Sequence, residues 1–185
     1  MSKFLFLSLF MFSNVAFSKV ETVPELDMER YLGDWYEIAA IPQRFQKECV
    51  SNVLAEYKKG DDGIIEVLNS CEKEDGSRKV AEARARKEDP DEPSKLEVTF
   101  VNFLGWRFLF SGQYWVIDLN EDYTYAVVGD ESTRYGWILS RTKTLSPELI
   151  ERAKAVLTKN GYDTCKFLTT IQDGGFTEKK KLCEI

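Results

Sequence analysis

Apolar and polar residues alternate in short runs along most of the chain, and turn residues separate each run from the next. Such a period of two is typical of β-strands that bury one face. The stretch 59–63, Lys-Gly-Asp-Asp-Gly, predicts a hairpin between two of the runs. We expect eight strands, at 34–41, 50–58, 64–71, 78–87, 96–101, 113–119, 123–129 and 135–142.

The connections between these runs are too short for crossover helices, so neighbouring strands should pair antiparallel. This arrangement predicts an all-β domain, built either as a sandwich or as a barrel. No internal repeat and no second domain is visible in the sequence.

A single helix is predicted after the eighth run. Ser146 can cap its N-terminus, and Pro147 suits the first helical position, where no N–H is needed. An apolar stripe from Leu149 to Leu157 covers one face, and Gly161 provides a stop. We expect this helix to pack against the outside of the strands, followed by a short final strand at 166–171.

The alternation also predicts which side chains face inward. In Glu82-Ala83-Arg84-Ala85-Arg86 the long charged side chains point outward and the alanines inward. Small inward residues leave space for a ligand, although a barrel of about eight strands can instead be filled by its own side chains. The candidate ligand-binding residues are Val53, Ala55, Tyr57, Ile65, Val67, Asn69, Ala83, Ala85, Val98, Phe100, Tyr114, Val116, Ala126, Val128, Trp137 and Leu139.

Composition removes several classes of function. The net charge of −6 argues against nucleic-acid binding, which needs a concentrated basic face. The chain has no histidine, which excludes Ser-His-Asp catalysis, imidazole-held zinc and histidine-ligated haem. We therefore predict neither catalytic residues nor a metal or cofactor.

Residues 1–18 have the features of an export signal. Lys3 precedes an apolar stretch from Phe4 to Phe12, and Ala16 and Ser18 form a small-x-small cleavage pattern. A buried N-terminal helix is the alternative. Cleavage would leave residues 19–185 as one domain, in the periplasm or secreted. No cysteine follows the predicted cut before Lys19, so we do not expect a lipid anchor there.

Four cysteines in an exported chain predict two disulfides. Cys49 and Cys71 lie at equal distances on either side of Gly60 in the predicted hairpin and share the inward face, so we expect them to pair. Cys165 and Cys183 would then form the second bond. The alternative joins Cys49 or Cys71 to Cys183.

The segment from Phe103 to Phe110, between the fifth and sixth strands, is too apolar for an ordinary exposed loop. It is consistent with a flap over a pocket mouth, with a patch that contacts a membrane, or with a local core of its own.

Three motifs resemble those of the lipocalin family, in particular the bacterial lipocalins and apolipoprotein D. The first is Gly33-Asp34-Trp35, after a short turn, and the second is Asp122-Tyr123, although Glu121 replaces the family's threonine. The third is the run 137–141, Trp-Ile-Leu-Ser-Arg. Their order and spacing span nearly all of the chain that follows the predicted signal.

This resemblance implies a closed, eight-stranded, up-and-down antiparallel barrel with the helix outside. It implies that Arg141 caps Trp35 beside Gly33 to close one end, a structural role in which a cation over an indole contributes about 0.5–2 kcal/mol. It also implies that Tyr57 and Trp137 line the pocket, and that the ligand is a fatty acid, a lysophospholipid or a similar lipid.

We therefore expect a protein without catalysis that carries a small hydrophobic or amphipathic ligand at the cell envelope. One alternative is an enzyme of the same shape that acts on a lipid or pigment through a cysteine thiol. Another is a module that contacts a protein or membrane through residues 103–110. The sequence leaves the ligand and the oligomeric state open.

Overall fold

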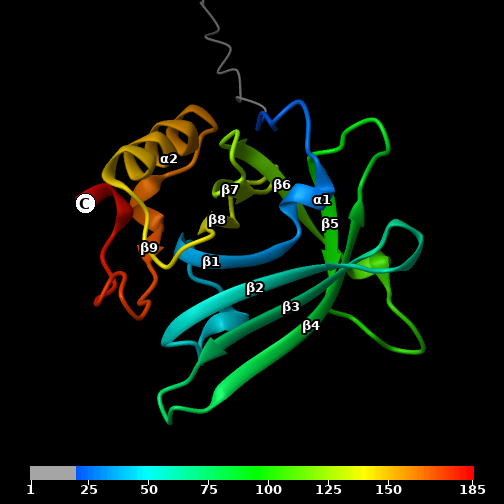
Figure 1. The fold of residues 1–185 in the computed structure, drawn as a ribbon, viewed down its shortest axis with the longest axis horizontal. Helices are drawn as coiled ribbons and strands as arrows, with labels where there is room; N and C mark the ends of the chain where they lie inside the picture. The colour runs from blue at the N-terminus through cyan, green and yellow to red at the C-terminus, as the bar shows by residue number, and fades with distance from the viewer. Residues whose placement is uncertain (1–19) are drawn as a thin grey trace, which may run out of the picture.

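A computed structural model describes residues 20–185, so the predicted signal peptide lies outside the described residues. Eight antiparallel strands form a closed barrel, because β1 pairs with both β8 and β2 (Figure 1). A ninth strand extends the sheet beside β1. The strands are β1 Gly33–Ala40, β2 Ser51–Lys59, β3 Ile65–Glu72, β4 Arg78–Lys87, β5 Lys95–Thr99, β6 Gly112–Leu119, β7 Tyr125–Gly129, β8 Gly136–Ser140 and β9 Leu168–Thr169.

Short helices connect and flank the strands. The described residues form two α-helices, α1 Met28–Tyr31 and α2 Pro147–Lys159. Neither is long and apolar enough to cross a membrane. The 3-10 helices are η1 Arg44–Gln46, η2 Asp61–Gly63, η3 Phe108–Phe110, η4 Thr164–Lys166 and η5 Leu182–Glu184.

The all-β class, the barrel and its eight strands are therefore confirmed, with small differences at strand ends. The seventh strand begins at Tyr125 rather than Tyr123. Tyr123 adopts a left-handed conformation, and the side-chain oxygen of Asn120 accepts hydrogen bonds from the backbone N–H groups of Thr124 and Tyr125. This local turn competes with the strand ladder.

Helix α2 packs against the outside of the barrel, as predicted. The Ser146 hydroxyl accepts a hydrogen bond from the Leu149 N–H and caps the helix. Ala153 and Leu157 are fully buried, in a cluster that lies between the helix and the outer face of β6, β7 and β8. A second cluster fills the inside of the barrel at its closed end.

Two disulfides join Cys49 to Cys71 and Cys165 to Cys183, which is the pairing predicted from the sequence. The first ties the segment before β2 to the end of β3. The second ties η4 to η5 at the C-terminus. All four cysteines lie among the described residues and none of them is free.

Candidate ligand-binding cavity

One end of the barrel is closed by a cation stacked on an indole ring. The Arg141 guanidinium lies 3.9 Å from the centre of the Trp35 ring, and Trp35 is fully buried. The same guanidinium donates hydrogen bonds of 2.8 Å to the carbonyl oxygens of Asp34, Arg30 and Leu32. One side chain therefore ties β8 to α1 and to the start of β1.

A residue with a side chain is disfavoured at position 33 for two physical reasons. The φ of Gly33, +95°, is a left-handed conformation that L side chains rarely adopt. A Cβ atom at this position would also lie only 3.2 Å from the Arg141 guanidinium. The glycine and the tryptophan of the first motif thus serve the same closure.

Three tyrosine hydroxyls form a hydrogen-bonded cluster above this plug. The Tyr57 hydroxyl donates to the Tyr114 hydroxyl at 3.0 Å, and Tyr114 and Tyr31 share a hydrogen bond of 2.8 Å. Burial raises the pKa of Tyr57 to about 12 and raises those of Tyr31 and Tyr114 as well. All three hydroxyls are therefore protonated and uncharged at neutral pH.

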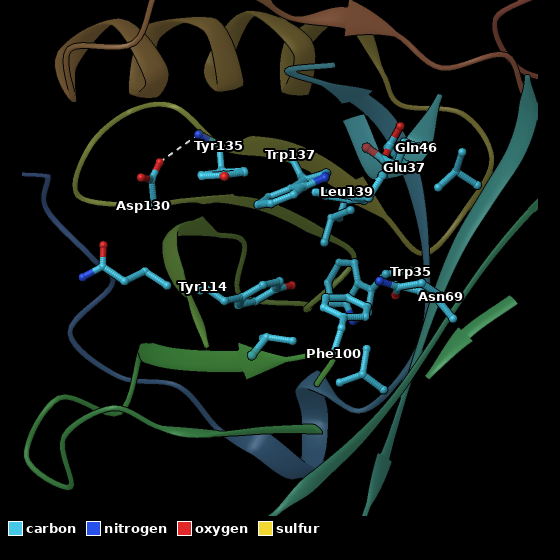
Figure 2. A pocket seen from close by; sticks show the side chains of 18 of the residues that line it. Trp35, Glu37, Gln46, Asn69, Phe100, Tyr114, Asp130, Tyr135, Trp137 and Leu139 are labelled. Atoms are coloured by element: carbon cyan, nitrogen blue, oxygen red, sulfur yellow. Dashed lines mark hydrogen bonds between the residues drawn. The ribbon is translucent and has the colours of Figure 1, made fainter. Parts of the chain in front are cut away.

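A cavity of about 630 Å³ occupies the rest of the barrel and opens at the other end. Three aromatic rings follow one wall from the mouth inward: Tyr135 stacks on Trp137 at 6.3 Å, and Trp137 on Tyr114 at 6.5 Å (Figure 2). Such a volume with mostly apolar walls and a few polar groups is typical of small-molecule sites. Ten of the sixteen candidate residues line it: Val53, Ala55, Tyr57, Val67, Asn69, Val98, Phe100, Tyr114, Trp137 and Leu139.

The other six candidates do point inward, but they do not line the cavity. They are buried in the core of the closed end, packed around Tyr31 and Trp35. Alternation along a strand predicts the face of a residue but not its depth, and the aromatic plug fills this part of the barrel. The six residues are Ile65, Ala83, Ala85, Val116, Ala126 and Val128.

Several lining residues were not predicted from the sequence. Ala81 continues the inward alternation of Ala83 and Ala85 on β4, and Glu37 follows Trp35 with the same parity on β1, so the alternation itself could have found both. Others lie outside the strands, where no such periodicity exists, among them Phe45 and Gln46 on η1 and Asp130, Arg134 and Tyr135 between β7 and β8.

Glu37 is a buried carboxylate in the cavity wall. It accepts hydrogen bonds from the Gln46 side chain at 2.9 Å and from the Thr170 hydroxyl at 2.5 Å. Burial raises the pKa of Glu37, and these two hydrogen bonds oppose the rise. Figure 2 shows Glu37 beside Gln46. The carboxylate thereby joins β1 to η1, whose Phe45 also lines the cavity.

The segment 103–110 lies beside the mouth and is largely exposed. The ring of Trp106 lies under the Arg84 guanidinium at 4.8 Å, and that of Phe108 under Arg86 at 4.0 Å. The interpretation of the segment as a local core is wrong, because its other apolar side chains have no cover. Their exposed fractions are 71% for Phe103, 83% for Leu104, 89% for Leu109 and 66% for Phe110.

A family model described as a lipocalin-like domain matches residues 26–172. The chain belongs to the lipocalin family. It is 38% identical over 157 residues to temperature-induced lipocalin-1 of Arabidopsis thaliana, covering 83% of each chain. It is 36% identical over 156 residues to outer membrane lipoprotein Blc of Escherichia coli K12, covering 84% of each. Mouse apolipoprotein D is 37% identical over 154 residues, covering 79% of this chain and 77% of that one.

Solved lipocalin structures share the fold. Insecticyanin from Manduca sexta superimposes with a TM-score of 0.64 at 24% identity, over 82% of this chain and 83% of its own. Apocrustacyanin C1 superimposes with a TM-score of 0.61 at 19% identity, over 79% of each chain. Lipocalins bind small hydrophobic ligands.

Proposed function

We propose that this lipocalin binds and carries one fatty acid, lysophospholipid or similar single-chain lipid at the cell envelope. The observation that supports it is the open cavity of about 630 Å³, with its aromatic wall and its closed floor. A single acyl chain suits a cavity with mostly apolar walls and a few polar groups. The ten lining candidates, from Val53 to Leu139, would contact this ligand.

The distribution of charge suggests how the ligand would lie. Arg134 and Lys79 line the cavity near the mouth together with Asp130 and Glu131, and Lys79 is ion-paired with Glu48 at 2.6 Å. The floor carries uncharged hydroxyls. The Arg134 side chain is exposed and donates a hydrogen bond to the Ser132 hydroxyl. We therefore place the acyl chain inward and the polar head group at the mouth, where water and the exposed Arg134 side chain remain available.

Residues 1–18 would be removed on export, leaving 19–185 in the periplasm or outside the cell, without a lipid anchor at the new N-terminus. Two disulfides support this location, because such bonds persist in oxidising compartments. An enzyme that uses a cysteine nucleophile is disfavoured, because each of the four cysteines is bonded to another.

Filling the cavity should abolish carriage without unfolding the barrel. Ala81 lines the cavity on β4 and is only partly buried, so Ala81→Trp places an indole where the acyl chain would lie. We expect the dissociation constant for a fluorescent fatty acid or lysophospholipid to rise at least about tenfold, a loss of roughly 1.4 kcal/mol. Fluorescence titration measures it.

Leu68→Trp is the matched control, because Leu68 lies on the neighbouring strand between two cavity residues but points away from the cavity. The affinity of the Leu68→Trp variant for the fluorescent lipid should equal that of the unmodified protein. Equal affinities for all three proteins would contradict the placement of the ligand in the barrel.

The exposed apolar residues favour a second activity, transient contact with a membrane. The connection between β5 and β6 exposes four apolar side chains, Phe103, Leu104, Leu109 and Phe110, which we call the apolar patch. Phe110 also lines the cavity, and Arg107 lies in the same segment. Patches of this kind mark interaction sites. A lipid leaving a bilayer would then pass directly from the membrane surface into the cavity.

Charging this patch should detach the protein from vesicles. Leu104→Asp combined with Leu109→Asp should weaken sedimentation with phosphatidylcholine–phosphatidylglycerol vesicles at least about tenfold, because buried apolar contacts become charged ones. Ala155→Asp combined with Thr158→Asp, both at exposed positions of α2, adds the same two negative charges elsewhere and should leave binding unchanged. Failure of the unmodified protein to sediment would remove this activity.

A further inference from the structure

The first half of β4 is a free sheet edge. Pairing between β4 and β5 begins only at Arg84, opposite Thr99, so the stretch from Arg78 to Glu82 has β3 on one side and no strand on the other among the described residues. Figure 1 shows this part of β4 along the outer margin of the sheet formed by β2, β3 and β4. The edge is open because the chain turns away after Thr99, whose hydroxyl donates a hydrogen bond to the Arg107 carbonyl oxygen.

The pairing on either side determines which backbone groups are free. The N–H of Glu88 donates to the Lys95 carbonyl oxygen on the β5 side, whereas the Ser77 carbonyl oxygen accepts from the Lys73 N–H on the β3 side. In an antiparallel ladder the direction of these groups alternates with each residue. The N–H and C=O of Arg78, Val80 and Glu82 therefore all point outward from the open edge.

The side chains of the same three residues are also accessible. Val80 has 53% of its surface exposed, and one charge of each sign stands two residues away on either side. Within the part of the chain that the structure describes, Arg78 donates to the Ser70 hydroxyl, and neither Arg78 nor Glu82 forms an ion pair. Along the edge, a positive, an apolar and a negative side chain thus follow one another at every second position.

We propose that a second copy of this chain pairs with this edge, antiparallel, about a two-fold axis at Val80. Antiparallel pairing of the stretch with itself places Arg78 opposite Glu82 of the second copy and Glu82 opposite Arg78 of that copy. Val80 lies opposite its own equivalent. The three outward residues of each chain then exchange backbone hydrogen bonds with the other chain, and both charges are neutralised.

The charge pattern selects this partner among possible strands. Charged side chains on an edge normally discourage pairing with other chains, because most registers leave charges unmatched. In the antiparallel register centred on Val80, both charged side chains face an opposite charge. A shift of the register by one residue would place the inward-facing Lys79 and Ala81 on the outer face. The contact is the same patch on both subunits, as closed dimers require.

Charge reversal and mixing test the proposal. Sedimentation equilibrium of the purified protein should show a monomer–dimer equilibrium. Arg78→Glu and Glu82→Arg each create two like-charged pairs, so each variant alone should raise the dimer dissociation constant at least about tenfold. An equimolar mixture of the two variants should dimerise again, since both mixed pairs join opposite charges. The double variant Arg78→Glu/Glu82→Arg should also dimerise.

Two further variants test whether dimerisation depends on this edge and not on another surface of the protein. Val80→Pro removes an outward N–H that faces no strand of its own chain, and it should give a folded monomer with unchanged ligand affinity. Lys87→Glu reverses a charge on the same strand where β5 covers the edge, and it should leave the dimer intact. A monomeric unmodified protein overturns the proposal. So does a dimer that persists in Arg78→Glu, or a mixture of the two single variants that stays monomeric.

Discussion

Trp35→Ala is expected to lower the free energy of unfolding by about 3–5 kcal/mol, as for other buried tryptophans. Trp35 is fully buried, and its indole N–H donates a hydrogen bond of 2.8 Å to the Tyr31 carbonyl oxygen. Alanine would leave a cavity beneath the Arg141 guanidinium and remove the ring on which that cation stacks. Equilibrium denaturation in urea measures the loss.

Trp137→Ala is the control for this variant. Trp137 is the same residue type but faces the open cavity and is only partly buried, so its removal takes away fewer packing contacts. We expect a clearly smaller loss of stability from Trp137→Ala and a weaker affinity for the lipid. An equal loss of stability from the two alanine variants would contradict the assignment of Trp35 to closure and Trp137 to the cavity.

Removal of the Cys49–Cys71 disulfide, by replacing both residues with serine, is expected to cost about 3 kcal/mol of stability. The bond closes a loop across a sequence separation of 22 residues. Both cysteines also line the cavity near the segment that carries Phe45 and Gln46. Ligand affinity should therefore fall together with stability, and thermal denaturation with lipid titration measures the two effects.

The other disulfide provides the comparison. Cys165–Cys183 has a similar sequence separation, 18 residues, but lies at the C-terminus outside the barrel. Its removal should cost a similar amount of stability and leave lipid affinity at temperatures below unfolding unchanged. If the two double serine variants changed lipid affinity equally, the structure of the cavity mouth would not depend on the Cys49–Cys71 bond.

Much of the fold could be predicted because its determinants are local. Alternation over several residues locates the strands, and the Ser146–Pro147 pair locates the start of α2. The end of β5 was placed too late, at Val101 rather than Thr99. The reason is tertiary, because the Thr99 hydroxyl bonds within the loop and turns the chain away from β4.

The cavity was less accessible to prediction than the fold. Parity correctly placed Val116 and Val128 inside the barrel, but their depth depends on how far the plug of Tyr31 and Trp35 extends. Glu37 is harder to predict, because a carboxylate is unexpected in a buried wall and its partners Gln46 and Thr170 are not adjacent to it in sequence. Loop residues such as Arg134 carry no periodic signal at all.

Native mass spectrometry of the protein purified from its own host tests the central proposal most directly, with lipid analysis of whatever the protein releases on denaturation. We expect a one-to-one complex that releases a fatty acid, a lysophospholipid or a similar single-chain lipid, and Ala81→Trp purified in parallel should carry none. A protein that arrives empty and binds no such lipid on titration would contradict carriage in the barrel.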